Sequence, residues 1–150
     1  MTLVGVLSSQ TGSVGCTNGG TDDTLYTFSL PANSMSANGK GVRVTTWGTA
    51  VNNANAKRVK TFFGATAVQS TALTAAQANA WKTVIEVIRT GAATQEAFGI
   101  FLEGGVVTLL DAAQSGPAET LSGAVTIKVT GNCTAASDIL GKAMIVEFLN

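Results

Sequence analysis

Two β-rich runs that lie close together in the sequence, joined through a pair of glycines, decide the fold: Ala97-Phe98-Gly99-Ile100-Phe101-Leu102-Glu103-Gly104-Gly105-Val106-Val107-Thr108-Leu109-Leu110. Each run is short and is bounded by turn-forming residues, which is typical of β-strands. The Gly104-Gly105 pair indicates a tight hairpin between them. This stretch therefore predicts two neighbouring antiparallel strands.

Further runs of the same kind lie on both sides of this stretch: Thr24–Leu30, Val42–Thr49, Arg58–Phe63, Trp81–Arg89, Ala124–Thr130 and Ala143–Leu149. Most alternate apolar with polar or small residues, as a strand with one solvated face does. Pro31 ends the first run, because proline lacks the N–H that pairing needs. Together with 97–102 and 106–110, these runs predict about eight strands.

The run from Trp81 to Arg89 is ambiguous. Ala78, Trp81, Ile85 and Ile88 lie three or four residues apart and would form one stripe of a helix. Alternate residues from Trp81 onward would instead line one face of a strand. We favour the strand, because β-branched residues dominate the run and Thr90-Gly91 ends it.

The strand series predicts an all-β fold, a sandwich or barrel of about eight strands. Residues 22–150 would form this single domain, and residues 1–21 an N-terminal arm or loop-rich segment. Four apolar residues of the arm are candidate partner contacts: Leu3, Val4, Val6 and Leu7. The alternative is an ordinary first strand that pairs inside its own subunit and places Cys16 in the core.

The chain carries little charge. It is 45% hydrophobic and 12% charged, and nine Lys and Arg residues balance nine Asp and Glu residues. A neutral chain has no long-range field to attract nucleic acid or an anionic membrane, so we expect neither partner. No apolar run approaches the roughly 18 residues of a membrane span, and the start lacks a signal peptide's basic residues. We therefore expect synthesis in the cytoplasm.

The residue types needed for most catalytic and metal sites are missing or scattered. There is no histidine, which removes the commonest general base and metal ligand. Glu96 and Glu103 are the best carboxylate pair, but seven residues apart they point to opposite faces of a regular strand. Asp22-Asp23 is too sparse for a calcium loop. We predict no catalytic site, no metal and no cofactor, and thus no enzyme.

Three smaller groups of residues each have a functional and a structural interpretation. Lys57, Arg58 and Lys60 form a basic cluster that could bind nucleic acid, but a strand with one solvated face explains it. Trp47 and Trp81 would stack on sugars if exposed, whereas such residues are usually core. We favour small buried residues for Cys16 and Cys133, although a disulfide stays open.

Four stretches together resemble a known family: Asp23–Met35, Val59–Gly64, Ile88–Gly91 and Val146–Leu149. In them the chain is similar to the small jelly-roll proteins of tailed phages, which serve as capsid decoration (cement) subunits or as β-sandwich modules of fibres. The four stretches are patterns of a sandwich core and contain no catalytic signature. The resemblance implies a jelly-roll-like antiparallel β-sandwich of about eight strands in two four-stranded sheets. It also implies frequent trimers, and contacts with the capsid shell through edges or an N-terminal arm.

The expected function is that of a structural virion protein, made in the host cytoplasm, that binds major capsid protein subunits on the capsid surface and stabilises the shell. A homo-oligomer, with a trimer favoured, is also expected. The alternative is a receptor- or carbohydrate-binding module of a phage tail or head fibre. Solvent-facing Trp47, Trp81 or Tyr26 beside polar groups would favour that alternative.

Overall fold

The computed structural model describes residues 5–17, 19–110 and 116–149. The regular secondary structure in these ranges consists entirely of β-strands. The strands are β1 (Gly5–Gly15), β2 (Asp22–Leu30), β3 (Gly41–Ala50), β4 (Lys57–Phe63), β5 (Thr66–Ala72), β6 (Ala80–Gly91), β7 (Thr94–Glu103), β8 (Val106–Leu110), β9 (Val125–Cys133) and β10 (Ile139–Leu149). The prediction of an all-β fold is confirmed. In the part of the chain that the structure describes, no helix could cross a membrane.

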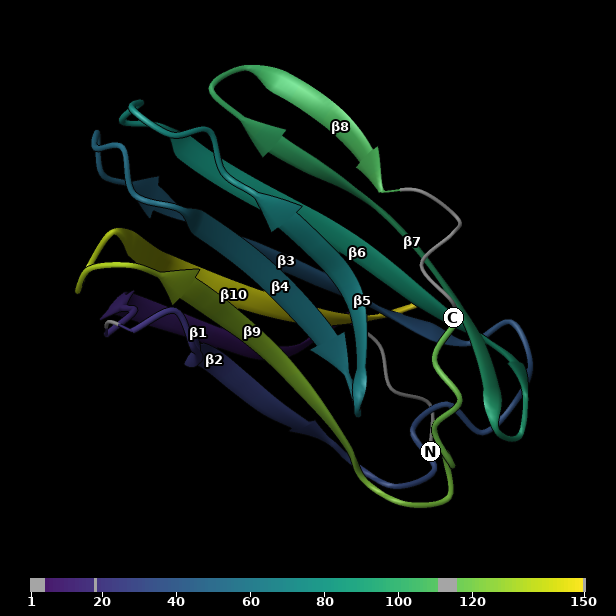
Figure 1. The fold of residues 1–150 in the computed structure, drawn as a ribbon. Helices are drawn as coiled ribbons and strands as arrows, with labels where there is room; N and C mark the ends of the chain where they lie inside the picture. The colour runs from purple at the N-terminus through teal and green to yellow at the C-terminus, as the bar shows by residue number, and fades with distance from the viewer. Residues whose placement is uncertain (1–4, 18, 111–115, 150) are drawn as a thin grey trace.

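The strands form two antiparallel sheets that pack as a sandwich (Figure 1). One sheet has the order β1-β10-β3-β6-β7-β8 and the other β2-β9-β4-β5. With β7 and β8 set aside, the remaining orders β1-β10-β3-β6 and β2-β9-β4-β5 are those of a jelly roll, in which the chain crosses repeatedly between two four-stranded sheets. The expected jelly-roll-like sandwich is therefore present.

Two details of the strand count differ from expectation. The resemblance implies four strands in each sheet, whereas one sheet has six, because the β7–β8 hairpin continues it beyond β6. Figure 1 shows this hairpin at one margin of the molecule, with β8 outermost. Strands β1 and β5 are also present, although their sequences predict none.

The interior is filled by alternate residues of strands that face each other across the sandwich. Trp81, Ile85 and Val87 of β6 are fully buried, which confirms a strand over a helix in this run. Gly48 of β3 makes room for this tryptophan, since a Cβ atom there would lie 2.6 Å from the Trp81 ring. Close packing of this kind fixes which residues β3 and β6 bring to the outer face.

Residues 5–15 are a strand of the sandwich and no loop-rich arm, which corrects that part of the prediction for 1–21. Strand β1 pairs antiparallel with β10 along its length, with Gly5 beside Phe148 and Gly15 beside Leu140. Leu7 and Val14 pack against the core. Hydrogen bonds to β10 hold this segment as a strand, and its Gly- and Ser-rich sequence does not predict that pairing by itself.

The two cysteines are buried and joined by a disulfide, which corrects the favoured interpretation as separate core residues. Cys16 follows β1, and Cys133 is the last residue of β9. The bond therefore links the two sheets at one end of the sandwich. The alternative of a first strand that places Cys16 in the core is confirmed for this residue.

Candidate protein-binding surface

The outer face of the six-stranded sheet is apolar where β6, β7 and β8 cross it. Six side chains share this side of the sheet and form what we call the β6–β8 face: Val84, Phe98, Ile100, Leu102, Val107 and Leu109. Ile100 lies between Val84 and Leu109 in the pairing, and Leu102 lies beside Val107. Adjacent strands thus bring apolar residues into continuous rows.

The β6–β8 face is open to solvent. Phe98 is 57% exposed, Val107 57% and Leu109 66%, while the other three members are half-buried. Soluble proteins rarely expose connected apolar side chains of this size unless another molecule covers them. The surface is therefore better suited to contact with another protein than to exposure to water.

The tight turn between β7 and β8 lets β8 continue the sheet beyond β7. Gly104 and Gly105 have φ angles of 55° and 86°, both in the left-handed region that a two-residue hairpin of this type requires. The hairpin carries β8 past the edge of the facing sheet, so both sides of β8 are open. Val106, on the side opposite the β6–β8 face, is 67% exposed.

Charged residues border the β6–β8 face. The Arg43 guanidinium donates to Glu86 Oε1 at 2.6 and 2.9 Å, and Glu86 lies beside Phe98. A hollow of about 190 Å³ lies between Glu86 and Ile100, with Val84, Phe98 and Gly99 also in its lining. An apolar centre with a polar border is the usual composition of a protein interface.

A larger pocket of about 440 Å³ adjoins one end of the face, with Trp47, Lys82, Leu102 and Glu103 among its lining residues. Trp47 is half-buried. The Glu103 carboxylate accepts hydrogen bonds from the Thr74 N–H and hydroxyl at 2.8 and 3.1 Å. The pocket therefore combines an aromatic wall with charged groups.

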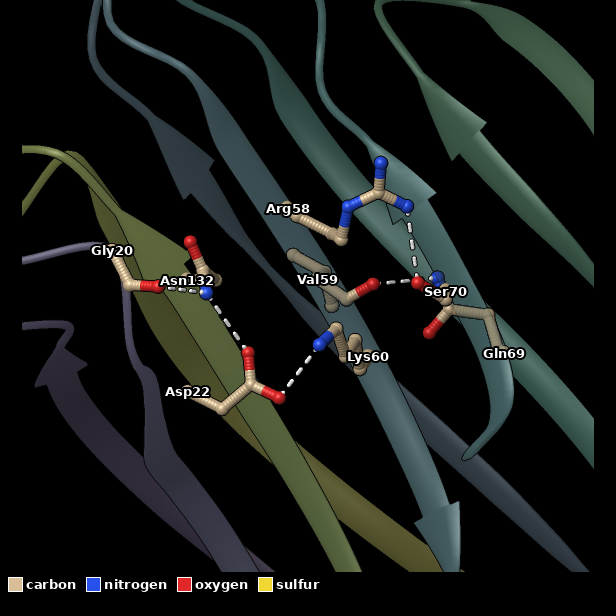
Figure 2. A network of polar contacts seen from close by, with 8 residues as sticks. All are labelled: Gly20, Asp22, Arg58, Val59, Lys60, Gln69, Ser70 and Asn132. Carbon is tan, nitrogen blue, oxygen red and sulfur yellow. Dashed lines mark hydrogen bonds and ion pairs between the residues drawn. The ribbon is translucent and has the colours of Figure 1, made fainter. Parts of the chain in front are cut away.

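The outer face of the four-stranded sheet is different, as Figure 2 shows. Lys60 Nζ lies 2.7 Å from Asp22 Oδ2, and Asn132 Nδ2 donates to Asp22 Oδ1 at 3.0 Å. Burial acts to raise the pKa of Asp22, but these hydrogen bonds and the charge of Lys60 outweigh it and lower that pKa. The polar groups of this face satisfy one another, which suits a solvated surface.

The predicted basic cluster does not form a joint surface. Lys57 is buried and donates to the carbonyl oxygens of Asn53 and Asn55. Arg58 and Lys60 do lie on the outer face of β4, where Arg58 donates to the Ser70 hydroxyl at 3.1 Å (Figure 2). Arg58 and Lys60 thus belong to the solvated face of the strand, and Lys57 belongs to its buried face.

The candidate acidic residues are spread over the molecule. Glu96 and Glu103 lie near opposite ends of β7. Asp23 accepts hydrogen bonds from the Thr17 N–H and hydroxyl, so it serves a turn. Among residues 5–17, 19–110 and 116–149, no three His, Cys, Asp or Glu side chains gather as metal ligands would.

Two of the three aromatic residues that would stack on sugars are core residues. Trp81 is 1% exposed, and Tyr26 is 4% exposed with its hydroxyl donating to the Gly12 carbonyl. Trp47 alone of the three is open to solvent in part. The burial of Trp81 and Tyr26 favours a structural role over sugar binding.

The four candidate arm contacts divide into two pairs. Leu3 and Val4 lie outside the described residues. Val6 is 59% exposed on β1, and Leu7 packs against the core of its own subunit. Contact of this segment with a partner stays a prediction.

The sequence contains a signal for the β6–β8 face in addition to the pattern that predicts its strands. A half-buried antiparallel strand alternates apolar and polar residues, but 97–102 and 106–110 contain no charged residue and are apolar at both alternations. Such strands have apolar residues on the face that should meet water. That mismatch points to Phe98, Val107 and Leu109.

Comparisons with known proteins add little. No protein-family model matches the chain, and no curated protein matches its sequence. A solved structure described as "Structure of infectious bursal disease virus Gt strain" aligns with 98% of this chain at 11% identity and a TM-score of 0.36. This chain covers 32% of that viral chain. A TM-score this low carries no argument on function.

Proposed function

We propose that this chain is a non-enzymatic structural protein of a virus particle that binds major capsid protein subunits at the capsid surface. The exposed, apolar β6–β8 face is the observation that carries the proposal, because it supplies a surface that needs a protein partner. The placement on a virus particle comes from the resemblance to phage decoration proteins. A trimer, also implied by that resemblance, is part of the proposal.

Binding of this kind would stabilise the shell by mass action, since a protein that binds only the assembled state favours it. Neither binding to the capsid nor stabilisation of the shell needs a substrate or a cofactor. The low charge of the chain fits the same role, because weakly charged surfaces resist association with other proteins poorly.

The test is retention of purified protein on particles that lack it, measured by co-sedimentation. Phe98→Lys places a charge on the β6–β8 face, and Val106→Lys places one on the opposite side of the same hairpin. We expect F98K to lose most of its retention and V106K to keep it, with the two melting temperatures close together. Equal retention of F98K and wild type would contradict the proposal.

A second candidate function is carbohydrate binding at the pocket lined by Trp47, Lys82 and Glu103. The half-buried tryptophan beside two charged side chains is the observation in its favour. Sugars that quench the tryptophan fluorescence of wild type but not of Trp47→Ala would support it. F98K leaves this pocket intact, so the two candidate functions are separable.

A further inference from the structure

The sandwich formed by the described residues has four edge strands, and three of them are protected against pairing with another chain. Strands β1 and β10 have two register shifts between them, β2 and β9 one, and β4 and β5 one. Bulges of this kind twist an edge away from a partner, and charges such as Asp22 and Asp23 on β2 do the same. Strand β8 pairs with β7 in one unbroken register from Val106 to Leu110.

The direction of the backbone groups of β8 follows from its neighbours. The Gly104 N–H donates to the Ala80 carbonyl, on the β6 side, at 3.2 Å. Successive residues of an antiparallel strand direct their N–H and C=O groups to alternate sides. Glu103 therefore directs its groups toward β8, and its partner Val106 directs its own toward β7.

By the same alternation, Thr108 faces β7, and Val107 and Leu109 direct their N–H and C=O groups to the free edge. No other strand of the described residues lies beside β8. Two N–H and two C=O groups are thus directed toward the position that a partner strand would occupy. They belong to the residues whose side chains are 57% and 66% exposed on the β6–β8 face.

We propose that β8 pairs antiparallel with β8 of a second copy, with Thr108 opposite Thr108 of the partner subunit. In this register Val107 exchanges both hydrogen bonds with Leu109 of the partner subunit, and the two-fold axis repeats the exchange. All four free groups are then paired. The biological role of this pairing rests on the proposed function. A second copy of the chain is one partner of the same surface.

Charge and shape favour a second copy as the occupant. Gly104 to Leu110 contains no charged residue, so an antiparallel repeat of this segment brings no like charges together. Val107 and Leu109 of both copies lie on one side of the joined sheet, because side chains of paired residues share a face. The two β6–β8 faces therefore merge into one apolar surface on two copies.

A pair of five-residue strands buries little area, so the free dimer is expected to be weak, and copies held close together on a particle would pair more completely. Two-fold pairing joins an even number of copies. If trimers form through another surface, β8 links one trimer to the next.

A cysteine substitution tests the register. Residues directly opposite in a non-hydrogen-bonded pair have Cα atoms about 4.5 Å apart, within the range of a disulfide. Both native cysteines are already bonded, so Thr108→Cys introduces a single free thiol. We expect mild oxidation to convert most T108C to a covalent dimer, seen on a non-reducing gel.

Two variants are controls for this experiment. Val106→Cys lies two residues from the axis, and Ser9→Cys lies on the edge strand β1, and both positions are exposed. Neither is expected to cross-link above the level of random collision. If T108C stays monomeric, or if V106C or S9C cross-links as fast, the pairing is overturned.

Paired charges give an independent measure. In V107K/L109K each lysine faces a lysine of the partner, whereas in V107K/L109E each lysine faces a glutamate. Sedimentation equilibrium should show roughly tenfold or greater weakening of the dimer in the first variant and recovery in the second. Equal dimer affinity of the two variants would contradict the register.

Particle retention separates this inference from the proposed function. F98K is expected to dimerise but not to bind particles, because Phe98 lies on β7, away from the edge. If wild-type protein binds particles but T108C never cross-links, the pairing fails and the proposed function stands. If T108C cross-links but wild-type protein does not bind particles, the proposed function fails and the pairing stands.

Discussion

Asp138 sits 2% exposed in the turn before β10, where its carboxylate is held entirely by polar neighbours. It accepts hydrogen bonds from the side chains of Asn53 and Asn55 and from the Ala135 N–H at 2.5, 2.9 and 2.9 Å. Burial acts to raise its pKa, but these hydrogen bonds and the charge of Lys57 outweigh burial and lower the pKa. The ionised form is thus the one that the fold stabilises.

The sign of the pH dependence follows from this lowered pKa. A carboxylate with a lower pKa in the folded than in the unfolded chain contributes stability above the unfolded value of 3.8, and loses it as the pH falls through the folded value. Asp22 acts in the same direction. We expect the free energy of unfolding in urea to be lower at about pH 3 than at about pH 7.

Asp138→Asn should reduce this pH difference and lower stability by about 1–3 kcal/mol at neutral pH, since buried Lys57 loses its counter-charge. Glu96→Gln, at an exposed carboxylate, is the control for removing a charge as such. A pH dependence in D138N as large as in wild type would show that Asp138 is not a source of it.

At the scale of elements, the disulfide holds β1 to the other sheet. Cys16 and Cys133 are 117 residues apart in the sequence, so the bond constrains a long loop of the unfolded chain. Constraint of a loop this long contributes about 4–5 kcal/mol in the chain-entropy description. Cys16→Ala with Cys133→Ala should lower the free energy of unfolding by several kcal/mol, by urea titration. A fall in the free energy of unfolding of less than about 1 kcal/mol would show that the disulfide does not stabilise the protein by constraining this loop in the unfolded chain.

Which strands the sequence predicts depends on how each strand is held. The eight predicted runs all contain several large apolar residues, and all eight form strands, although those of 106–109 are exposed. Strand β5 has the sequence Thr66-Ala67-Val68-Gln69-Ser70-Thr71-Ala72, with one large apolar residue. Buried Gln69 is accommodated because its amide donates to the Val59 carbonyl and the Thr71 hydroxyl. Hydrogen bonds of this kind depend on a neighbouring strand and leave no periodic signal.

The candidate surface was predictable only in part, for a related reason. The apolar residues of 97–110 are visible in the sequence, but the sequence does not show that Phe98, Val107 and Leu109 lie on the outer side of the sheet, away from the facing sheet. Local sequence does not specify how far one sheet extends past another. Val106 lies on the inner side of β8, where a further strand of the facing sheet would cover it.

At the scale of the whole molecule, the fold depends on the joining of distant parts of the chain. Strand β10 lies between β1 and β3, and its Ile139, Met144 and Val146 are fully buried. Strand β1 lies at the edge of the same sheet and contributes partly buried Leu7 and Val14. Loss of a central strand opens the core, whereas loss of part of an edge strand removes few buried contacts.

Deletions at the two ends should therefore differ. Removal of residues 139–150 is expected to abolish the cooperative thermal transition, because it leaves β1 and β3 without their common neighbour. Removal of residues 1–8 is expected to lower stability by about 1–3 kcal/mol, mainly through lost burial of Leu7. Thermal melts followed by circular dichroism would separate the two outcomes.

The shorter deletion also tests the predicted contact of Leu3, Val4, Val6 and Leu7 with a partner, if it is compared with Leu7→Ala. L7A loses the core contact of Leu7 but keeps the rest of the segment, so it matches the deletion in its effect on the subunit. If the segment contacts the shell, the deletion should be retained on particles less well than L7A, per folded molecule. Equal retention of the two would mean that residues 1–8 serve their own subunit, where Leu7 packs against the core and β1 pairs with β10.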